Sequence, residues 1–189
     1  KAKLVIAKVL DDKGMGDPRR TAQGIRYCIN KKCDIINCSI AGPMDNELED
    51  AVNEAYSKGI IVVAATGNDG KNMLLYPASY LNCLSVGSIN KSLEVSPFSN
   101  YNVFMTMVAP GEDIIFDING EKIKDSGTSF SAPLVSGTLA LLKEKLKEEL
   151  GRKPEYSELY NELIKNCVIV NNIDRIKQGH GYLDFSAKY

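Results

Sequence analysis

The stretch Ile60-Ile-Val-Val-Ala-Ala65 decides the fold class, because it is apolar at every position and too short to be a helix. A strand with no polar position is covered on both faces, as in a parallel sheet. Residues 34–40 and 83–87 are also strand-like, and apolar residues at helical spacing precede 34–40 and occupy 45–59. Alternating strands and helices predict βαβ units with right-handed crossovers. We therefore expect one α/β domain over 1–189, with a mostly parallel sheet flanked by helices.

Four other segments are assigned by the same reasoning. Residues 4–10 form a short apolar run rich in β-branched residues, so we expect a buried strand there. Residues 97–124 show a pattern of loops and short strands. A helix is expected over about 129–150, with a buried first half, and an amphipathic helix over about 155–166.

Charge and composition exclude several functions. Lys plus Arg total 23 against 24 Asp plus Glu, so the net charge of −1 gives no reason to expect nucleic acid or an acidic membrane as partner. No apolar run approaches the ~20 residues of a membrane span. His180 is the single histidine, which excludes a histidine metal cluster. No Cys-x-x-Cys pair occurs, so we expect neither a zinc nor a redox site from the five scattered cysteines, Cys28, Cys33, Cys38, Cys83 and Cys167.

The segment Ser126-Gly-Thr-Ser-Phe-Ser-Ala-Pro133 begins the long helix. Free N–H groups and the positive end of the helix dipole beside Ser129 would stabilise an oxyanion. Pro133 is expected in the first turn, where its missing N–H costs no hydrogen bond. The structural alternative is that Ser129 or Thr128 only caps the helix.

Two further segments follow strands, at the edge where ligands bind in open α/β sheets. Asn68, in Val62-Val-Ala-Ala-Thr-Gly-Asn-Asp-Gly70, is either a turn residue or an amide donor to a developing oxyanion. Ile36-Asn-Cys-Ser-Ile-Ala-Gly42 is either an ordinary strand end or an extended edge that pairs with a peptide.

Taken in order, Asn37-x-Ser-Ile-x-Gly42, Val63-Ala-Ala-x-Gly-Asn-x-Gly70 and Gly127-Thr-Ser-x-x-Ala-Pro-x-Val-x-Gly137 resemble the motifs of the subtilisin-like serine proteases, the subtilases. The resemblance covers about residues 3–184. It implies a three-layer subtilisin-like fold and a serine endopeptidase that cleaves peptide bonds through an acyl-enzyme. Shorter matches support it: Tyr76-Pro-Ala78, Phe98-Ser-Asn100, Val108-Ala-Pro-Gly111 and Gly179-His-Gly-Tyr-Leu-Asp184.

The resemblance also implies roles for single residues. Ser129 would be the nucleophile, and the Asn68 amide would bind the oxyanion together with the N–H of Ser129. The substrate backbone would lie along Ser39, Ile40, Ala41 and Gly42. Ala65, Thr66, Gly67 and Leu75 would line the pocket for the side chain before the cut, with Leu75 favouring small or medium apolar residues.

Three positions depart from the family pattern. Relatives commonly have Gly-Gly where this chain has Ala41-Gly42, and an added methyl group would narrow the cleft or restrict the backbone. Leu134 stands where many relatives have His, and Ser126 where many have Asn. Neither of the last two positions carries the main chemistry.

A serine nucleophile needs a base and an orienting carboxylate. In subtilases both lie N-terminal to the segment that begins this sequence, and neither the Asp-[Ser/Thr]-Gly nor the His-Gly-Thr-His type of segment occurs here. We therefore expect a partial catalytic domain that lacks the N-terminal strands and is inactive or nearly so by itself. His180, in a Gly-His-Gly turn, is interpreted as a surface residue rather than a substitute base.

Two functions from different classes stay open. The chain is either the C-terminal part of a serine endopeptidase, or a non-catalytic pseudo-protease that binds peptides or a partner protein. The expected partners are a peptide or protein substrate and the missing N-terminal part of the same protein. No cofactor or metal site is predicted, although the resemblance allows calcium. Free cysteines favour a reducing, cytoplasmic interior, whereas the resemblance also allows secretion.

Overall fold

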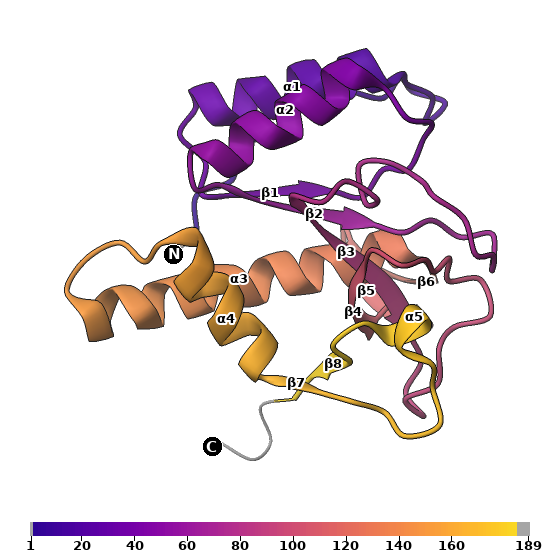
Figure 1. Cartoon of the computed structure of the whole chain (residues 1–189). Coiled ribbons are helices and arrows are strands. Elements are labelled where there is room, and N and C mark those ends of the chain that lie inside the picture. Colours follow the sequence, from indigo (N-terminus) through magenta and orange to yellow (C-terminus); the bar gives the residue numbers. More distant parts are fainter. Residues whose placement is uncertain (1, 185–189) are drawn as a thin grey trace.

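The computed structural model describes residues 2–184 (Figure 1). Its helices and strands follow one another as α1 (Pro18–Asn30), β1 (Ile35–Cys38), α2 (Asn46–Ser57), β2 (Ile61–Ala65), β3 (Cys83–Ile89), β4 (Met105–Pro110), β5 (Ile114–Ile118), β6 (Glu121–Asp125), α3 (Thr128–Leu150), α4 (Tyr156–Lys165), β7 (Cys167–Val168), α5 (Arg175–Gln178) and β8 (Tyr182–Leu183). None of the described helices is long and apolar enough to cross a membrane.

The main sheet has the strand order β1-β2-β3-β4-β8-β7. The pairs from β1 to β8 are parallel, and only the short β7 runs antiparallel to its neighbour. This confirms the predicted α/β class with a mostly parallel sheet. The crossover from β1 to its parallel neighbour β2 contains α2, and the connection from β4 to β8 contains α3 and α4, whereas α1 precedes β1.

Helices cover the sheet on both faces, so three layers result (Figure 1). The helices α1 and α2 pack on one face, and α3 and α4 pack on the other. The strand β2 shows why its sequence has no polar position: Val62 and Ala64 belong to the core beneath α1 and α2, whereas Ile61, Val63 and Ala65 belong to the core beneath α3. All five residues are buried, as predicted for a strand covered on both faces.

Side chains that accept hydrogen bonds fix two of the helix starts. The carboxylate of Asp17 accepts from the N–H of Arg20, and the carboxylate of Asp45 accepts from the N–H of Leu48. Glu47 and Glu49 follow Asp45 in the first turn of α2, where their negative charge suits the positive end of the helix dipole.

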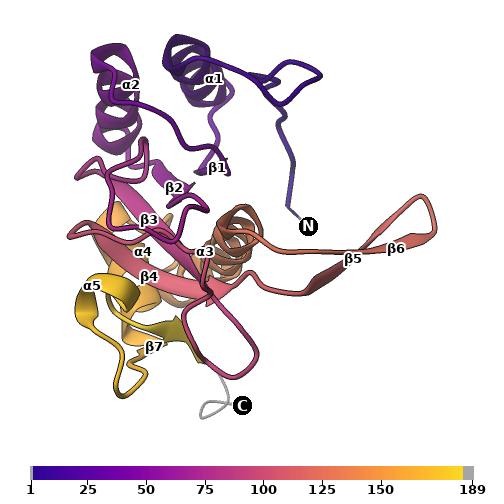
Figure 2. The ribbon, with the colours of Figure 1, turned by 90° about the vertical axis from the view of Figure 1, so that its right-hand side faces the viewer.

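The expected buried strand over residues 4–10 is wrong. The segment is in no strand, and Leu4 and Ile6 are 82% and 78% exposed. Ala7 packs against the core beneath α1 and α2, so one side of the segment contacts the protein and the other does not. Figure 2 shows it running apart from β1. A strand needs a neighbour for its backbone hydrogen bonds, and among the described residues none lies alongside.

The region 97–124 contains loops and short strands, as its sequence pattern predicted. The strand β4 lies inside the sheet, between β3 and β8, and five of its six residues are buried. Beyond it, β5 and β6 form an antiparallel hairpin that projects from the rest of the molecule (Figure 2). The hairpin then leads directly into the start of α3.

Candidate active site

Three strand ends meet the N-terminus of α3. The hydroxyl of Ser39, just after β1, donates to the carbonyl oxygen of Ser129 at 2.9 Å. The N–H of Gly67, two residues after β2, donates to Oγ1 of Thr128 at 3.1 Å. The N–H of Gly127 donates to the carbonyl oxygen of Gly111, just after β4, at 2.7 Å. The carboxyl edge of the sheet therefore surrounds the partly exposed Ser129, where sites of open α/β sheets are expected.

The amide of Asn68 is held in one orientation. Its Oδ1 accepts from the N–H and from Oγ1 of Thr128, both at 2.9 Å. Since the oxygen end is occupied by two donors, the Nδ2 end is the one that faces away from Thr128. Among the described residues Nδ2 has no hydrogen-bond partner, so its N–H groups are available to an acceptor from outside.

Gly127 marks the space between the two side chains. A Cβ atom built there would lie 3.0 Å from Oγ of Ser129 and 3.4 Å from Nδ2 of Asn68. The predicted nucleophile and the predicted amide donor therefore border one small volume, which the absence of a side chain at 127 leaves open. An oxyanion in that volume would be within reach of Nδ2 of Asn68 and next to the predicted nucleophile.

Thr128 is the functional residue that sequence reasoning treated only as a possible cap. It is 1% exposed, and its hydroxyl donates to Asn68 while accepting from the N–H of Gly67. It therefore ties the loop after β2 to the start of α3. A buried hydroxyl between two loops that both approach Ser129 has no signature in the sequence except its place inside Gly-Thr-Ser.

Pro133 does not lie in the first turn, as the sequence analysis expected. The helix begins at Thr128, so Pro133 falls in the second turn. There the N–H of any other residue would donate to the carbonyl of Ser129, and proline has no N–H. The Ser39 hydroxyl supplies that carbonyl with a donor instead. Asn37 in turn donates to Oγ of Ser39 at 3.0 Å and accepts from the hydroxyl of Ser136 at 3.0 Å, which adds a second polar link between β1 and α3.

The predicted pocket residues lie together beside this site. Ala65, Thr66 and Gly67 are buried, and the buried Asn100 holds the loop that follows them by accepting from the N–H groups of Asp69 and Lys71 at 3.0 Å. A Cβ atom on Gly67 would lie 2.7 Å from Cδ1 of Leu75.

Leu75 is partly exposed and belongs to none of the described core clusters. It therefore packs along the Gly67 backbone, on the side where the pocket is predicted. Its sequence neighbour Tyr76 is joined to Pro77 by a cis peptide bond.

The segment Ile40-Ala41 has an unpaired backbone. It follows β1, Ala41 is exposed, and neither residue makes a backbone hydrogen bond to another described residue. Gly42 then pairs with Tyr76 through two hydrogen bonds of 2.9 Å. An extended chain with free N–H and C=O groups is what a peptide needs for β-sheet pairing.

His180 lies away from these residues. Its N–H donates to the carbonyl oxygen of Thr106 near the start of β4, whereas Gly111 beyond the end of β4 contacts Gly127. Five residues of strand, roughly 16 Å, separate these contacts. Burial and then the nearby Arg175 lower the pKa of His180. Its position agrees with its interpretation as a residue outside the site.

Over residues 2–184, no three metal-ligating side chains gather into one group. No described residue is therefore assigned to calcium.

A partly exposed serine at a helix N-terminus, beside an oriented amide, is the arrangement that an enzyme with a serine nucleophile would use. The chain belongs to the subtilase family, whose model matches residues 1–181.

The chain is 40% identical over 194 residues to the major intracellular serine protease of Bacillus subtilis, covering 98% of this chain and 60% of that protein. It is 34% identical to the minor extracellular protease Epr of Bacillus subtilis, covering 99% of this chain and 29% of that protein. Among solved structures, the prenylagaramide maturation protease PagA superposes with a TM-score of 0.84 at 32% identity, covering 92% of this chain and 67% of the other. The chain thus spans 60% and 29% of the length of these two curated relatives, which is less than two thirds of each.

Proposed function

We propose that this chain forms the nucleophile and oxyanion side of a serine endopeptidase. The hydroxyl of Ser129 attacks the carbonyl carbon of a peptide bond and forms an acyl-enzyme, which water then hydrolyses. The Asn68 amide and the N–H of Ser129 stabilise the oxyanion that develops on the substrate. The substrate is a peptide or a protein.

One observation carries this proposal: Thr128 holds Oδ1 of Asn68, so Nδ2 is directed at the open volume that Ser129 also borders. A residue that only shaped a turn would not need its amide fixed by two donors on the neighbouring helix. Family membership and the named serine proteases among the relatives support the same reaction.

The base and the orienting carboxylate come from outside these 189 residues in this proposal. The single histidine of the chain is held at the opposite end of β4, and we assign no other described side chain as the acceptor of the Ser129 proton. The 189 residues alone are therefore expected to show at most trace turnover. Loss of the triad histidine costs about two million-fold in a subtilisin.

The substrate backbone pairs with the free edge at Ile40-Ala41, and the side chain before the cut enters the pocket at Ala65–Gly67. The contact of Leu75 with Gly67 supports its role in narrowing that pocket. We therefore propose a preference for small or medium apolar residues over Phe or Tyr. The variant Leu75→Gly, profiled on a peptide library, should gain turnover of Phe and Tyr substrates relative to Ala and Val. If the ratio of turnover between these two groups of substrates did not change, Leu75 would not line the pocket.

The test of the nucleophile uses the intact protein that contains this chain. A serine-directed fluorophosphonate should label the tryptic peptide of residues 125–143, and fragmentation should place the adduct on Ser129. Ser129→Ala should abolish both the label and peptide hydrolysis, with peptide affinity nearly unchanged. The matched control is Ser126→Ala, three residues earlier and exposed, which should retain both.

The alternative, a pseudo-protease that binds peptides or a partner without cutting, makes the opposite prediction. The intact protein would bind peptides but would neither take the label nor turn over, and Ser129→Ala would then change nothing. Neither function decides the cellular compartment, because one relative is named intracellular and another extracellular.

A further inference from the structure

The C-terminus of α1 brings two cysteines together. Lys32 has a positive φ of 58°, the N–H of Lys32 donates to the carbonyl of Ile29 at 2.9 Å, and the N–H of Cys33 donates to the carbonyl of Cys28 at 3.1 Å. These are the two hydrogen bonds of a Schellman motif, in which the third-last helical residue and the second residue past the cap bring their side chains into contact. Cys28 and Cys33 occupy those two positions.

The geometry is compatible with a disulfide. Because the 3.1 Å hydrogen bond joins the two backbones directly, the Cα atoms of Cys28 and Cys33 lie no more than about 7 Å apart. Disulfides usually join Cα atoms about 4.4–6.8 Å apart. Both side chains belong to the core beneath α1 and α2, where Cys28 is 8% exposed and Cys33 is partly exposed. Burial first, and then the neighbouring Cys33 thiol, raise the pKa of Cys28.

We propose that Cys28 and Cys33 form a peroxide-sensitive modification site that closes into a disulfide. The partly exposed Cys33 reacts first, since it is the thiol of the pair that solvent reaches. Its thiolate attacks one oxygen of hydrogen peroxide, the O–O bond breaks, and the products are a sulfenic acid on Cys33 and hydroxide.

Cys28 completes the reaction. The Cys28 thiol releases its proton, its thiolate attacks the Cys33 sulfur, and the S–O bond breaks. The oxygen leaves as hydroxide, which takes up the released proton and becomes water. In total, the two thiols lose two electrons and two protons, and one peroxide becomes two waters. The sequence analysis expected no redox site because the spacing here is Cys-x4-Cys rather than Cys-x-x-Cys. The Schellman motif brings the two side chains of the Cys-x4-Cys segment into contact in spite of the longer spacing.

The other cysteines are less suited to this reaction. Cys38 and Cys83 are 4% and 5% exposed, so peroxide reaches them poorly. Cys167 is partly exposed but lies on β7, against the core on the opposite face of the sheet. Cys38 also lies near Cys28, so it is the competitor that the experiment must separate.

The experiment exposes the intact, folded protein to hydrogen peroxide, blocks free thiols, and maps tryptic peptides without reduction. Trypsin cleaves after Lys31 and Lys32, between the two cysteines, so the disulfide joins residues 27–31 to residues 33–58. Fragmentation between Cys33 and Cys38 shows which of them is linked. The expected result is a Cys28–Cys33 link with a mass loss of two hydrogen atoms, reversed by a dithiol.

Cys33→Ser should abolish the link, and Cys167→Ser, also at a partly exposed cysteine, should leave it intact. With Cys28→Ala, Cys33 should instead end as a sulfenic or a sulfinic acid. A dimedone probe detects the sulfenic acid, and the mass of the peptide that contains Cys33 shows the sulfinic acid. A link from Cys28 to Cys38, or stable over-oxidation of Cys33 while Cys28 is present, would overturn the proposal. So would two free thiols after peroxide treatment that fully oxidises free cysteine.

Discussion

At Gly127 a single methyl group would enter the proposed site. Its φ of 162° is extended backbone that any residue adopts, so a side chain there meets no backbone strain. The obstacle is space, because a Cβ atom would lie 3.0 Å from Oγ of Ser129 and 3.4 Å from Nδ2 of Asn68. The methyl group would fill the volume that the proposed oxyanion needs.

We therefore predict that Gly127→Ala lowers kcat/KM of the intact protein by about 100-fold, the cost of a misplacement near 1 Å. The midpoint of urea unfolding should stay near that of the unmodified protein. Gly137→Ala is the matched control, because a Cβ atom on that helical glycine meets nothing within 4 Å. Full activity in Gly127→Ala would show that no reacting atom occupies this volume.

Asn68→Ala should lower kcat by about 100- to 1,000-fold, the range for loss of this donor in a subtilisin. KM should change little, because the amide serves a charge that develops in the transition state. Steady-state kinetics on a peptide substrate separate the two constants. A large rise in KM with normal kcat would assign Asn68 to turn structure.

At the scale of elements, the start of α3 depends on Pro133 and Ser39 together. Pro133 removes the helical donor for the carbonyl of Ser129, and the hydroxyl of Ser39 from the end of β1 replaces it at 2.9 Å. The strand thereby fixes the first turn of the helix that carries the proposed nucleophile. Removing the hydroxyl would leave a carbonyl without a donor, which costs about 1–3 kcal/mol when the group is buried.

A double-mutant cycle tests this pairing. Ser39→Ala should lower the free energy of unfolding by about 1 kcal/mol, toward the lower end of that range because Ser129 is only partly buried. In a Pro133→Ala background the N–H at 133 returns, so the same Ser39→Ala change should cost clearly less. Urea unfolding of the four proteins gives the coupling. Strictly additive effects would mean that Ser39 and Pro133 act independently.

The sequence predicted those elements whose stability is local or whose burial is complete. The strand β2 has no polar position, and α2 begins with a capping Asp45 and an acidic first turn, so both were found. Residues 4–10 have a strand's composition but no neighbouring strand, and composition does not report a neighbour. The strand β4 lies where short strands were predicted, but its place inside the main sheet depends on pairing with β8, which is distant along the chain.

The site was predictable to the extent that motifs carry it. Ser129 and Asn68 were found because each sits in a short motif at the end of a core element, and their roles remain predictions. The contribution of Thr128 and the link from Ser39 to Ser129 were not found. Each is a side-chain contact between segments 60 or 90 residues apart, which spacing along the chain cannot report.

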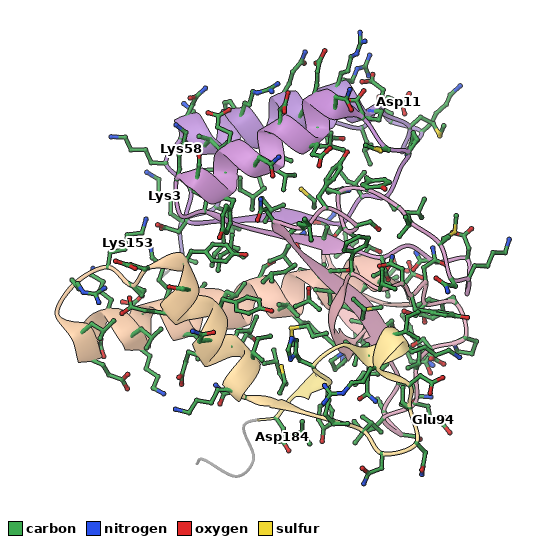
Figure 3. The ribbon with its side chains drawn as sticks, in the orientation of Figure 1. Lys3, Asp11, Lys58, Glu94, Lys153 and Asp184 are labelled. Carbon is green, nitrogen blue, oxygen red and sulfur yellow. The ribbon has the colours of Figure 1, made fainter. Side chains whose placement is uncertain are left out.

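At the scale of the whole molecule, Asp34 ties three parts together. It lies just before β1, and its carboxylate pairs with Lys143 of α3 at 2.6 Å and with Lys153 of the α3–α4 connection at 3.0 Å. Figure 3 shows Lys153 on that connection. Burial raises the pKa of Asp34, but the hydrogen bonds and charges of the two lysines outweigh it and hold the pKa below its ordinary 3.8.

A lowered pKa fixes the sign of the pH dependence. The stabilisation is complete above the ordinary pKa and is lost as the pH falls toward the lower pKa of the folded protein. Asp34→Asn should therefore lower the free energy of unfolding by about 0.5–1 kcal/mol at pH 7, a value limited by solvent screening. The deficit should shrink at pH 3. Asp50→Asn, an exposed carboxylate without an ion pair among the described residues, is the control. An equal deficit at both pH values would contradict the assignment.

The parallel strand order also decides how this molecule could be mounted on a solid support. The hydrogen bonds that join Ser39, Gly67 and Gly111 to the start of α3 come from the carboxyl edge of the sheet. Leu81, 87% exposed, lies two residues before β3 at the opposite edge. A protein anchored to a bead or electrode through position 81 would present its reactive edge to the flowing solution. The point of attachment and the proposed peptide site would then lie at opposite edges of one sheet.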